Sequence, residues 1–296
     1  MRLNIFYKKG TIAVEMNLTF ANDNRSTRIR REKGVTYISF PLLEREGVVC
    51  AFTTRLGGVS TGDCTSMNLS FTRGDREEDV RENYRLMGEC LSIDMNQAVL
   101  SHQVHKTDIH IVTEEDRGRG ISLEKASLFE KDGLMTNRKG IPLVTFFADC
   151  VPLIFYDPVK RVIASSHSGW KGTVGKIGEK TVAMMEQEMG CKREDILAVI
   201  GPSICQDCYE VSADVAQQFE NVFSREQYEE MIIEKENEKY QLDLWKANEF
   251  ILLDAGIRRE HLAVTDLCTC CNKEFLFSHR ASHGRRGNLS VILCLI

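Results

Sequence analysis

Residues 146–172 read FFADCVPLIFYDPVKRVIASSHSGWKG and contain two apolar, β-branched runs, 151–156 and 161–166, separated by a turn sequence. Short runs of this composition, bounded by turn residues, are typical of strands. Asp157 followed by Pro158 suits the first two positions of a type I turn. The stretch therefore predicts an antiparallel hairpin at the centre of the fold.

The register of this hairpin suggests a metal site. If Tyr156 lies opposite Arg161, Cys150 lies opposite His167. Directly opposed side chains have Cβ atoms about 4.5–5.5 Å apart, so a thiolate and an imidazole there can share one ion. A bulge of one residue would break this relation. The alternative is that both side chains only pack in the core.

A third ligand is expected from SHQVHKTDIH, which follows the apolar run ending at Leu100. His102 and His105 are three residues apart and cannot both point to the same side of a straight strand. Spacing alone does not choose between them. Two histidines and one cysteine, with a fourth position open, form a recognised catalytic zinc set. Zinc would hold Cys150 as a thiolate and activate water in the open position.

Strands and helices alternate irregularly along the rest of the chain. This predicts an α/β fold of mixed α+β type, a layered arrangement of helices around a mixed sheet in a single main domain. The predicted strands are residues 48–53, 97–100, 109–113, 143–148, 151–156, 162–166 and 196–200. The predicted helices are residues 78–90, 172–189, 213–219 and 242–255.

The first 34 residues differ from the rest. A short strand is expected at 11–20, and the polar, basic residues 21–34 predict a mobile connector. We therefore divide the chain into an N-terminal extension, 1–34, and a metal-dependent catalytic domain, 35–296.

Composition excludes several classes of protein. The net charge of −5 gives no electrostatic reason to bind nucleic acid or anionic membranes. No apolar stretch reaches membrane-spanning length, and the N-terminus lacks the features of a signal peptide. The 11 cysteines are odd in number and irregularly spaced, which argues against a disulfide framework. We expect a cytoplasmic protein.

Basic groups in two loops are candidates for substrate binding. Lys171 lies in the glycine-rich SGWKGTVG before a predicted helix, whose free N–H groups would suit phosphate or carboxylate. A tight turn with close helix–sheet packing is the alternative. Arg55 in FTTRLGGVS suits bidentate contact with phosphate or a base edge, and Asn68 follows in SMNLS.

The remaining cysteines gather near the C-terminal end. Cys205 and Cys208 form a CxxC pair, and Cys268, Cys270 and Cys271 lie close to two histidines in sequence. A second, structural zinc site would need four ligands. Because the spacing is not that of a standard zinc finger, we expect free or locally packed thiols here.

Several of these motifs together resemble the laccase-domain family, known also as multicopper polyphenol oxidase, peptidoglycan editing factor and purine nucleoside phosphorylase. The resemblance runs from about Val35 to the C-terminus. The family's metal ligands correspond to His105, Cys150 and His167, so the resemblance selects His105 over His102. The motifs are FTTRLGGVS with SMNLS, QVH, ADCVPLIFYDP, SHSGWKGTVGKI, IGPSICQDCYEV, and TDLCT followed by FSHR.

The resemblance implies a layered α/β sandwich with its site in a surface pocket. It also implies phosphorolysis of adenosine, inosine and methylthioadenosine, with adenosine deamination alongside, by a cytoplasmic monomer or weak dimer. Arg280 of FSHR is a further substrate-binding candidate, although His279 and Asn288 depart from the family's pattern nearby. Asp149 is the nearest acidic candidate for acid–base catalysis, unless it only braces the metal ligands.

Three rival functions remain. Copper-dependent phenol oxidation is disfavoured because 7 histidines are too few for a blue-copper centre plus a trinuclear cluster. A metal-free hydrolase would use Cys150 as nucleophile and His167 as base. A cell-wall or partner-binding module would hold zinc only as a structural ion, which normally takes four protein ligands.

Overall fold

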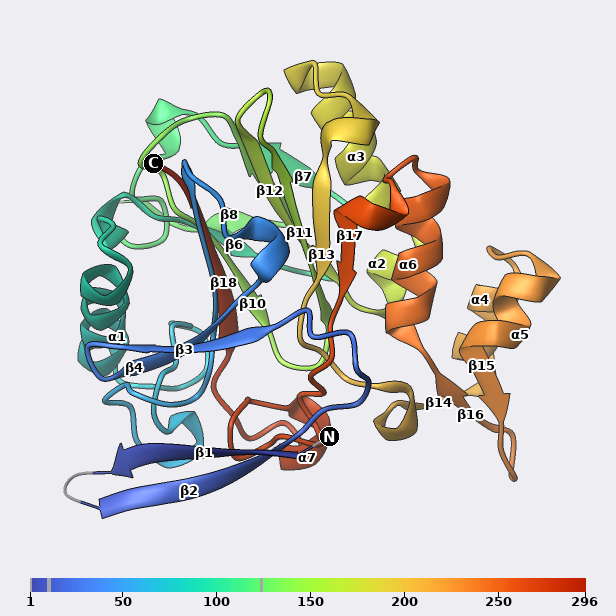
Figure 1. Ribbon diagram of the computed structural model, residues 1–296, viewed down its shortest axis with the longest axis horizontal. Coiled ribbons are helices and arrows are strands. Elements are labelled where there is room, and N and C mark those ends of the chain that lie inside the picture. The colour runs from blue at the N-terminus through green and yellow to red at the C-terminus, as the bar shows by residue number, and fades with distance from the viewer. Residues whose placement is uncertain (1, 10–11, 123–124) are drawn as a thin grey trace.

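Two β-sheets face each other at the centre of the molecule, and helices cover their outer faces (Figure 1). This computed structural model describes residues 2–9, 12–122 and 125–296. One sheet runs β3 (Arg28–Glu32), β4 (Val35–Ser39), β5 (Val48–Thr53), β18 (Leu289–Leu295), β10 (Leu143–Phe147), β6 (Val99–His102) and β8 (Leu128–Phe129). The other runs β17 (Leu262–Val264), β13 (Leu197–Ile200), β11 (Val151–Asp157), β12 (Val162–Ser168), β9 (Gly133–Thr136) and β7 (Ile109–Ile111).

Helices and smaller sheets complete the fold. The helices are α1 (Glu77–Leu91), α2 (Trp170–Val174), α3 (Ile177–Met189), α4 (Ala213–Glu220), α5 (Arg225–Met231), α6 (Leu244–Asp254) and α7 (His279–Ser282). The smaller sheets are the hairpin β1 (Arg2–Lys9) with β2 (Ile12–Thr19), and the trio β14 (Glu210–Ser212), β16 (Lys239–Leu242) and β15 (Ile232–Glu234). Both large sheets contain parallel and antiparallel pairs, so the predicted mixed α/β fold is confirmed.

Alternation along β11 shows how the layers form. Ile154 and Tyr156 are buried in the core between the two sheets, whereas Leu153 and Phe155 are buried in the core beneath α3 and α6. Successive strand residues point to opposite faces, so a strand covered on both faces is apolar throughout. On the other side, α1 packs Val80 onto the seven-stranded sheet as part of a third core (Figure 1).

The predicted register of the central hairpin is wrong by two residues. Pro152, rather than Cys150, pairs with His167, because Asp157 still belongs to the strand and pairs with Val162. The Asp157 carboxylate accepts hydrogen bonds from the N–H groups of Val159 and Lys160 at 2.8 and 2.9 Å, so the turn begins one residue later than predicted, at Pro158. A shift of two keeps every side chain on its predicted face, so Cys150 and His167 still converge.

The helix predicted at 172–189 is two helices, α2 and α3, with a break at Gly175 and Lys176. Gly175 lies so close to the loop before β7 that a Cβ there would be 2.7 Å from the Thr107 methyl carbon. Lys176 has a φ of +55°, which ends one helix and redirects the chain into the next.

Part of the predicted connector is a strand. Arg28–Glu32 forms β3 at the edge of the seven-stranded sheet and pairs with β4. Residues 1 and 10–11 of the predicted extension lie outside the described residues, and its boundary at residue 34 stays a prediction. Within the described ranges, no helix has the length and apolar character needed to cross a membrane.

The core between the sheets should dominate stability. Ile154 is 0% exposed, and Ile154→Ala should lower the free energy of unfolding by about 2–5 kcal/mol by leaving a cavity. Val159 on the same hairpin is 67% exposed, so Val159→Ala should change the free energy of unfolding by less than about 0.5 kcal/mol. Urea unfolding measures both; equal losses would contradict this account of the core.

Candidate metal centre

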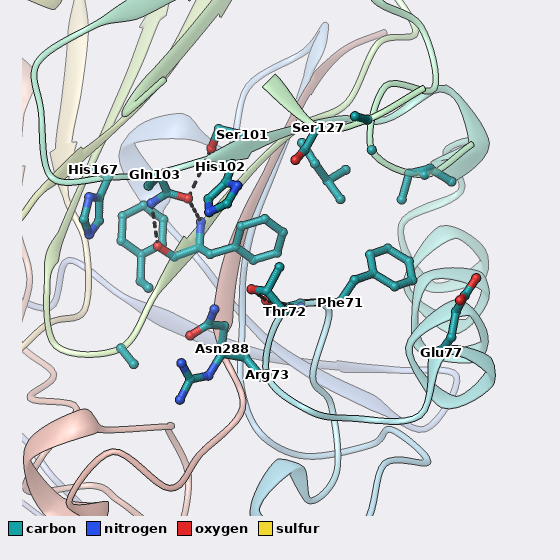
Figure 2. Close-up of a pocket in the computed structure, with 18 of the residues that line it drawn as sticks. Phe71, Thr72, Arg73, Glu77, Ser101, His102, Gln103, Ser127, His167 and Asn288 are labelled. Carbon is teal, nitrogen blue, oxygen red and sulfur yellow. Dashed lines mark hydrogen bonds between the residues drawn. The ribbon is translucent and has the colours of Figure 1, made fainter. Parts of the chain in front are cut away.

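A pocket of about 510 Å³ opens beside the ends of β6 and β10. Its volume is in the range of pockets that hold small molecules. In the view of Figure 2, His167 lies at one end of the pocket and Phe71 and Glu77 at the other, with Arg73 and Asn288 along one side.

Three side chains converge at one end of this pocket. One nitrogen of His105, the sulfur of Cys150 and one nitrogen of His167 lie within 4.8 Å of one another. The Cys150 sulfur is 4.0 Å from Nε2 of His105, too long for a strong hydrogen bond. Zinc bonds of about 2.0–2.3 Å place the ligand atoms of one ion at roughly such separations. The three atoms thus have the spacing of a ligand set.

Each side chain reaches the cluster from a different segment. Cys150 directly precedes β11, His167 lies near the end of β12, and His105 lies in the loop after β6. Gln103 fixes that loop, since its side-chain amide donates to the carbonyl of Phe146 at 2.7 Å and accepts from its N–H at 2.9 Å (Figure 2).

Asp132 ties two of the three together. Its buried carboxylate accepts hydrogen bonds from the backbone N–H groups of Val104, His105 and Lys106 at 2.9–3.1 Å. It also pairs with Nδ1 of His167 at 2.9 Å. With Nδ1 as the donor, Nε2 of His167 is left with its lone pair available for a metal.

Charge in the cluster favours the form of cysteine that metals bind. Burial would raise the pKa of Cys150, but the charge of His167 and hydrogen bonds from both histidines lower it to about 6. Burial would likewise lower the pKa of His167, but Cys150 and Asp132 raise it to about 9. The thiolate is the species that coordinates metals.

Gly169 makes room for the cluster. A Cβ at this position would lie 3.0 Å from the Cys150 sulfur and 3.2 Å from a ring carbon of His105. Both contacts are tighter than ordinary van der Waals separations, so any side chain at residue 169 would crowd the ligand atoms.

Asp149 does not line the pocket. Its carboxylate accepts hydrogen bonds from Thr269 Oγ1 at 2.7 Å and from the N–H of Arg280 at 2.6 Å. Its φ of +85° is unusual for a residue with a side chain. Both carboxylate oxygens of Asp149 therefore contact residues outside the pocket, and its two predicted roles stay predictions.

The four predicted substrate-binding residues also lie outside the described residues that line the pocket. Arg55 donates to the carbonyls of Thr65 and Lys273. Lys171 lies over the ring of its neighbour, Trp170.

The other two are held by backbone groups. The Asn68 amide is fully buried and forms hydrogen bonds with Ser70 and with the N–H of Asn288. The Arg280 guanidinium donates to the carbonyls of Cys208 and Glu210. The side chains of Arg55, Asn68 and Arg280 therefore hold loops together in this structure.

Sequence reasoning missed Arg73 and Arg286, two of the arginines that line the pocket. Each belongs to a loop far from the metal motifs in sequence, and only the fold brings them there. Asp132 was missed for the same reason. The Gly-Arg-Arg-Gly run at 284–287 was a signal that could have indicated Arg286.

Known proteins share this fold and much of this sequence. The chain is 36% identical to purine nucleoside phosphorylase YlmD of Bacillus subtilis over 255 residues, which cover 82% of this chain and 86% of that protein. It is 32% identical to adenosine deaminase RL5 of an unknown prokaryotic organism, over 79% of this chain and 89% of that protein.

Solved structures share the fold of this chain. The crystal structure of the Bacillus licheniformis hypothetical protein YfiH superimposes with a TM-score of 0.85 at 33% identity, covering 90% of this chain and 99% of that one. The sequence profile described as multi-copper polyphenol oxidoreductase laccase matches residues 49–296. With this match over most of its length, the chain belongs to the multi-copper polyphenol oxidoreductase laccase family.

Proposed function

We propose that this protein is a zinc-dependent purine nucleoside phosphorylase, acting on adenosine, inosine and methylthioadenosine, that also deaminates adenosine. The observation that carries the proposal is the set of His105, Cys150 and His167 at the end of a pocket large enough for a nucleoside. Relatives named purine nucleoside phosphorylase and adenosine deaminase support the same pair of activities.

The three ligand side chains fit a zinc ion with one position left for a reactant. They supply one thiolate and two imidazoles, a set found in catalytic zinc sites, and Gly169 keeps space free beside them. When bound, the ion would supply Lewis acidity. Asp132 keeps His167 in one orientation, and Gln103 keeps the loop of His105 in place.

Phosphate would bind at Arg73 and Arg286. Among the described residues, Nε of Arg286 is buried without a hydrogen-bond partner, so its N–H is available to an anion. Burial lowers the pKa of Arg286 to about 10, and the charge of nearby Arg73 adds to the effect. Two neighbouring guanidinium groups that repel each other are stabilised by a bound anion.

The nucleoside would occupy the rest of the pocket. Phe71 and Phe146 supply half-buried aromatic surface, and Ser101, His102 and Gln103 add polar groups. An apolar pocket with a few polar groups is typical of small-molecule sites. The aromatic rings would contact the flat purine, which leaves the ribose toward the arginines and the metal ligands.

We favour zinc over copper. Across the described ranges, only one cluster of potential metal ligands includes histidine, and it offers two imidazoles and one thiolate. A blue-copper centre joined to a trinuclear cluster would need many more histidines than that.

One observation favours a second candidate, the metal-free hydrolase. Cys150, His167 and Asp132 follow the order of a nucleophile, a base and an orienting carboxylate. The second imidazole, His105, also faces the thiol, which a metal explains better. Strong chelation would abolish zinc-dependent turnover and spare the hydrolase.

The protein would act in the cytoplasm as a monomer or weak dimer. All 11 cysteines are unpaired, which suits a reducing compartment.

The first prediction concerns the thiolate ligand. Cys150→Ala should lose the zinc ion of the pocket. It should also lower the formation of ribose phosphate from inosine and phosphate by more than about 100-fold, a larger loss than follows from altering a residue that only orients a ligand. Metal analysis and product chromatography on the same samples measure both. Cys90→Ala, which alters a buried thiol of α1 outside the pocket, is the control. Full activity in Cys150→Ala would refute the proposal.

The second prediction concerns Asp132. Asp132→Asn should weaken zinc affinity about 10- to 100-fold, because His167 loses its orienting carboxylate. Competition with a chromogenic chelator measures the affinity. Asp116 pairs with His110 at 3.0 Å outside the pocket, so Asp116→Asn is a matched control that should bind zinc normally. Equal affinities in the two variants would contradict the role given to Asp132.

The third prediction separates the two activities. Arg286→Gln should lower kcat/KM for phosphate by about 10- to 100-fold, the value of a charged hydrogen bond, and should largely spare adenosine deamination, which uses no phosphate. Arg285→Gln, at its exposed neighbour, is the control. A parallel fall in both activities would show that Arg286 does not act as a phosphate ligand.

A further inference from the structure

We propose that Cys205, Cys208, Cys268 and Cys271 bind a second zinc ion in a closed, structural site. Their four sulfurs lie within 4.8 Å of one another. The proposal departs from the sequence-based expectation of free or locally packed thiols. It is independent of the pocket and of the reaction proposed there.

Topology brings the two pairs of cysteines together. Strands β13 and β17 are parallel neighbours, so their carboxyl ends meet at the same edge of the sheet. Cys205 and Cys208 follow the first strand, and Cys268 and Cys271 follow the second. A bridge between Ser203 and Cys268 continues the pairing into the loops.

The spacing is that of many zinc sites. Two cysteines two residues apart in one loop face another such pair in a second loop, the C-x₂-C…C-x₂-C arrangement. Sequence reading grouped Cys270 with the last pair and hid this pattern. Cys270 is not part of the cluster.

Backbone groups already stabilise negative charge on one of the sulfurs. The sulfur of Cys268 accepts hydrogen bonds from the N–H groups of Cys205 at 3.3 Å and of Cys271 at 3.4 Å. Ordinary packed thiols need no such donors, whereas a metal-bound thiolate is an acceptor whose charge they compensate. The bond from the Cys205 N–H also ties the first cysteine loop to the second.

The distances favour an ion over disulfides. The sulfur of Cys271 is 4.0 Å from that of Cys205 and 3.5 Å from that of Cys208, far beyond the roughly 2.05 Å of a disulfide bond. One tetrahedral ion satisfies four thiolates at once. A disulfide between Cys271 and either partner would leave two thiols unused.

The site would also position the pocket. Within the same two loops, the Ile204 N–H donates to the carbonyl of Asp149 at 3.0 Å, and Thr269 donates to its carboxylate. Asp149 directly precedes Cys150. An ion that joins the two loops would thus fix the backbone that presents the pocket's thiolate.

Metal content tests the proposal. Full-length protein purified with reductant and zinc should contain two zinc ions per chain, and Cys205→Ser and Cys208→Ser should each contain one. Cys270→Ser, a cysteine beside the cluster, should keep two. Cys150→Ala should lose only the other ion, so failure of the pocket proposal and failure of this one give different results.

Cobalt substitution keeps the test decisive if a serine variant unfolds. Cys150→Ala loaded with Co²⁺ should show strong thiolate-to-cobalt absorption from the four-cysteine site. Cys271→His in the same background should keep a tetrahedral cobalt spectrum, because three cysteines and a histidine also bind zinc. The proposal would be overturned if the protein held a single zinc ion that Cys150→Ala removed. It would also be overturned if Cys150→Ala showed no thiolate-to-cobalt absorption, or if the four cysteines held iron in place of zinc.

Discussion

The buried carboxylate of Asp132 is the interaction on which the site depends. An ionised carboxylate can be held in the interior only if its charge and lone pairs are matched. Here three consecutive N–H groups of the His105 loop and the ring of His167 match them. Burial would raise the pKa of Asp132, but His167 lowers it, so the carboxylate stays charged. One group thereby fixes two ligands from distant segments.

The two-sheet architecture explains why these segments meet. The opposite sheet buries one face of each central strand and helices bury the other, which fixes β11, β12 and β18 in place. Metal ligands at the ends of these strands are therefore held in fixed positions, whereas the surrounding loops can vary in conformation. The same principle applies at the β13 and β17 ends, where two loops carry the four-cysteine cluster. Asp149 links the two clusters, because it directly precedes Cys150 and forms hydrogen bonds with Ile204 and Thr269 of the two cysteine loops.

The sequence predicted elements that have a local pattern, and it did not predict contacts that depend only on how distant segments pack. The alternation and turn of the central hairpin were readable, although Asp157 shifted the register. Strand β18 at Leu289–Leu295 was not predicted, because a strand buried on both faces has no alternation to read. The hairpin register brought Cys150 and His167 together in the sequence reading, and motif resemblance selected His105 as the third ligand. Asp132 meets His167 through a contact that no spacing along the chain reveals, and Arg286 was marked only by its Gly-Arg-Arg-Gly run. Arg55 and Lys171 contact groups outside the pocket.

The most direct test of the account is a crystal structure with anomalous diffraction measured on both sides of the zinc absorption edge. The account predicts a zinc peak bonded to His105, Cys150 and His167, with a fourth ligand that does not come from the protein. A fully loaded crystal with no peak between these side chains, or with a fourth protein side chain closing the coordination, would contradict it.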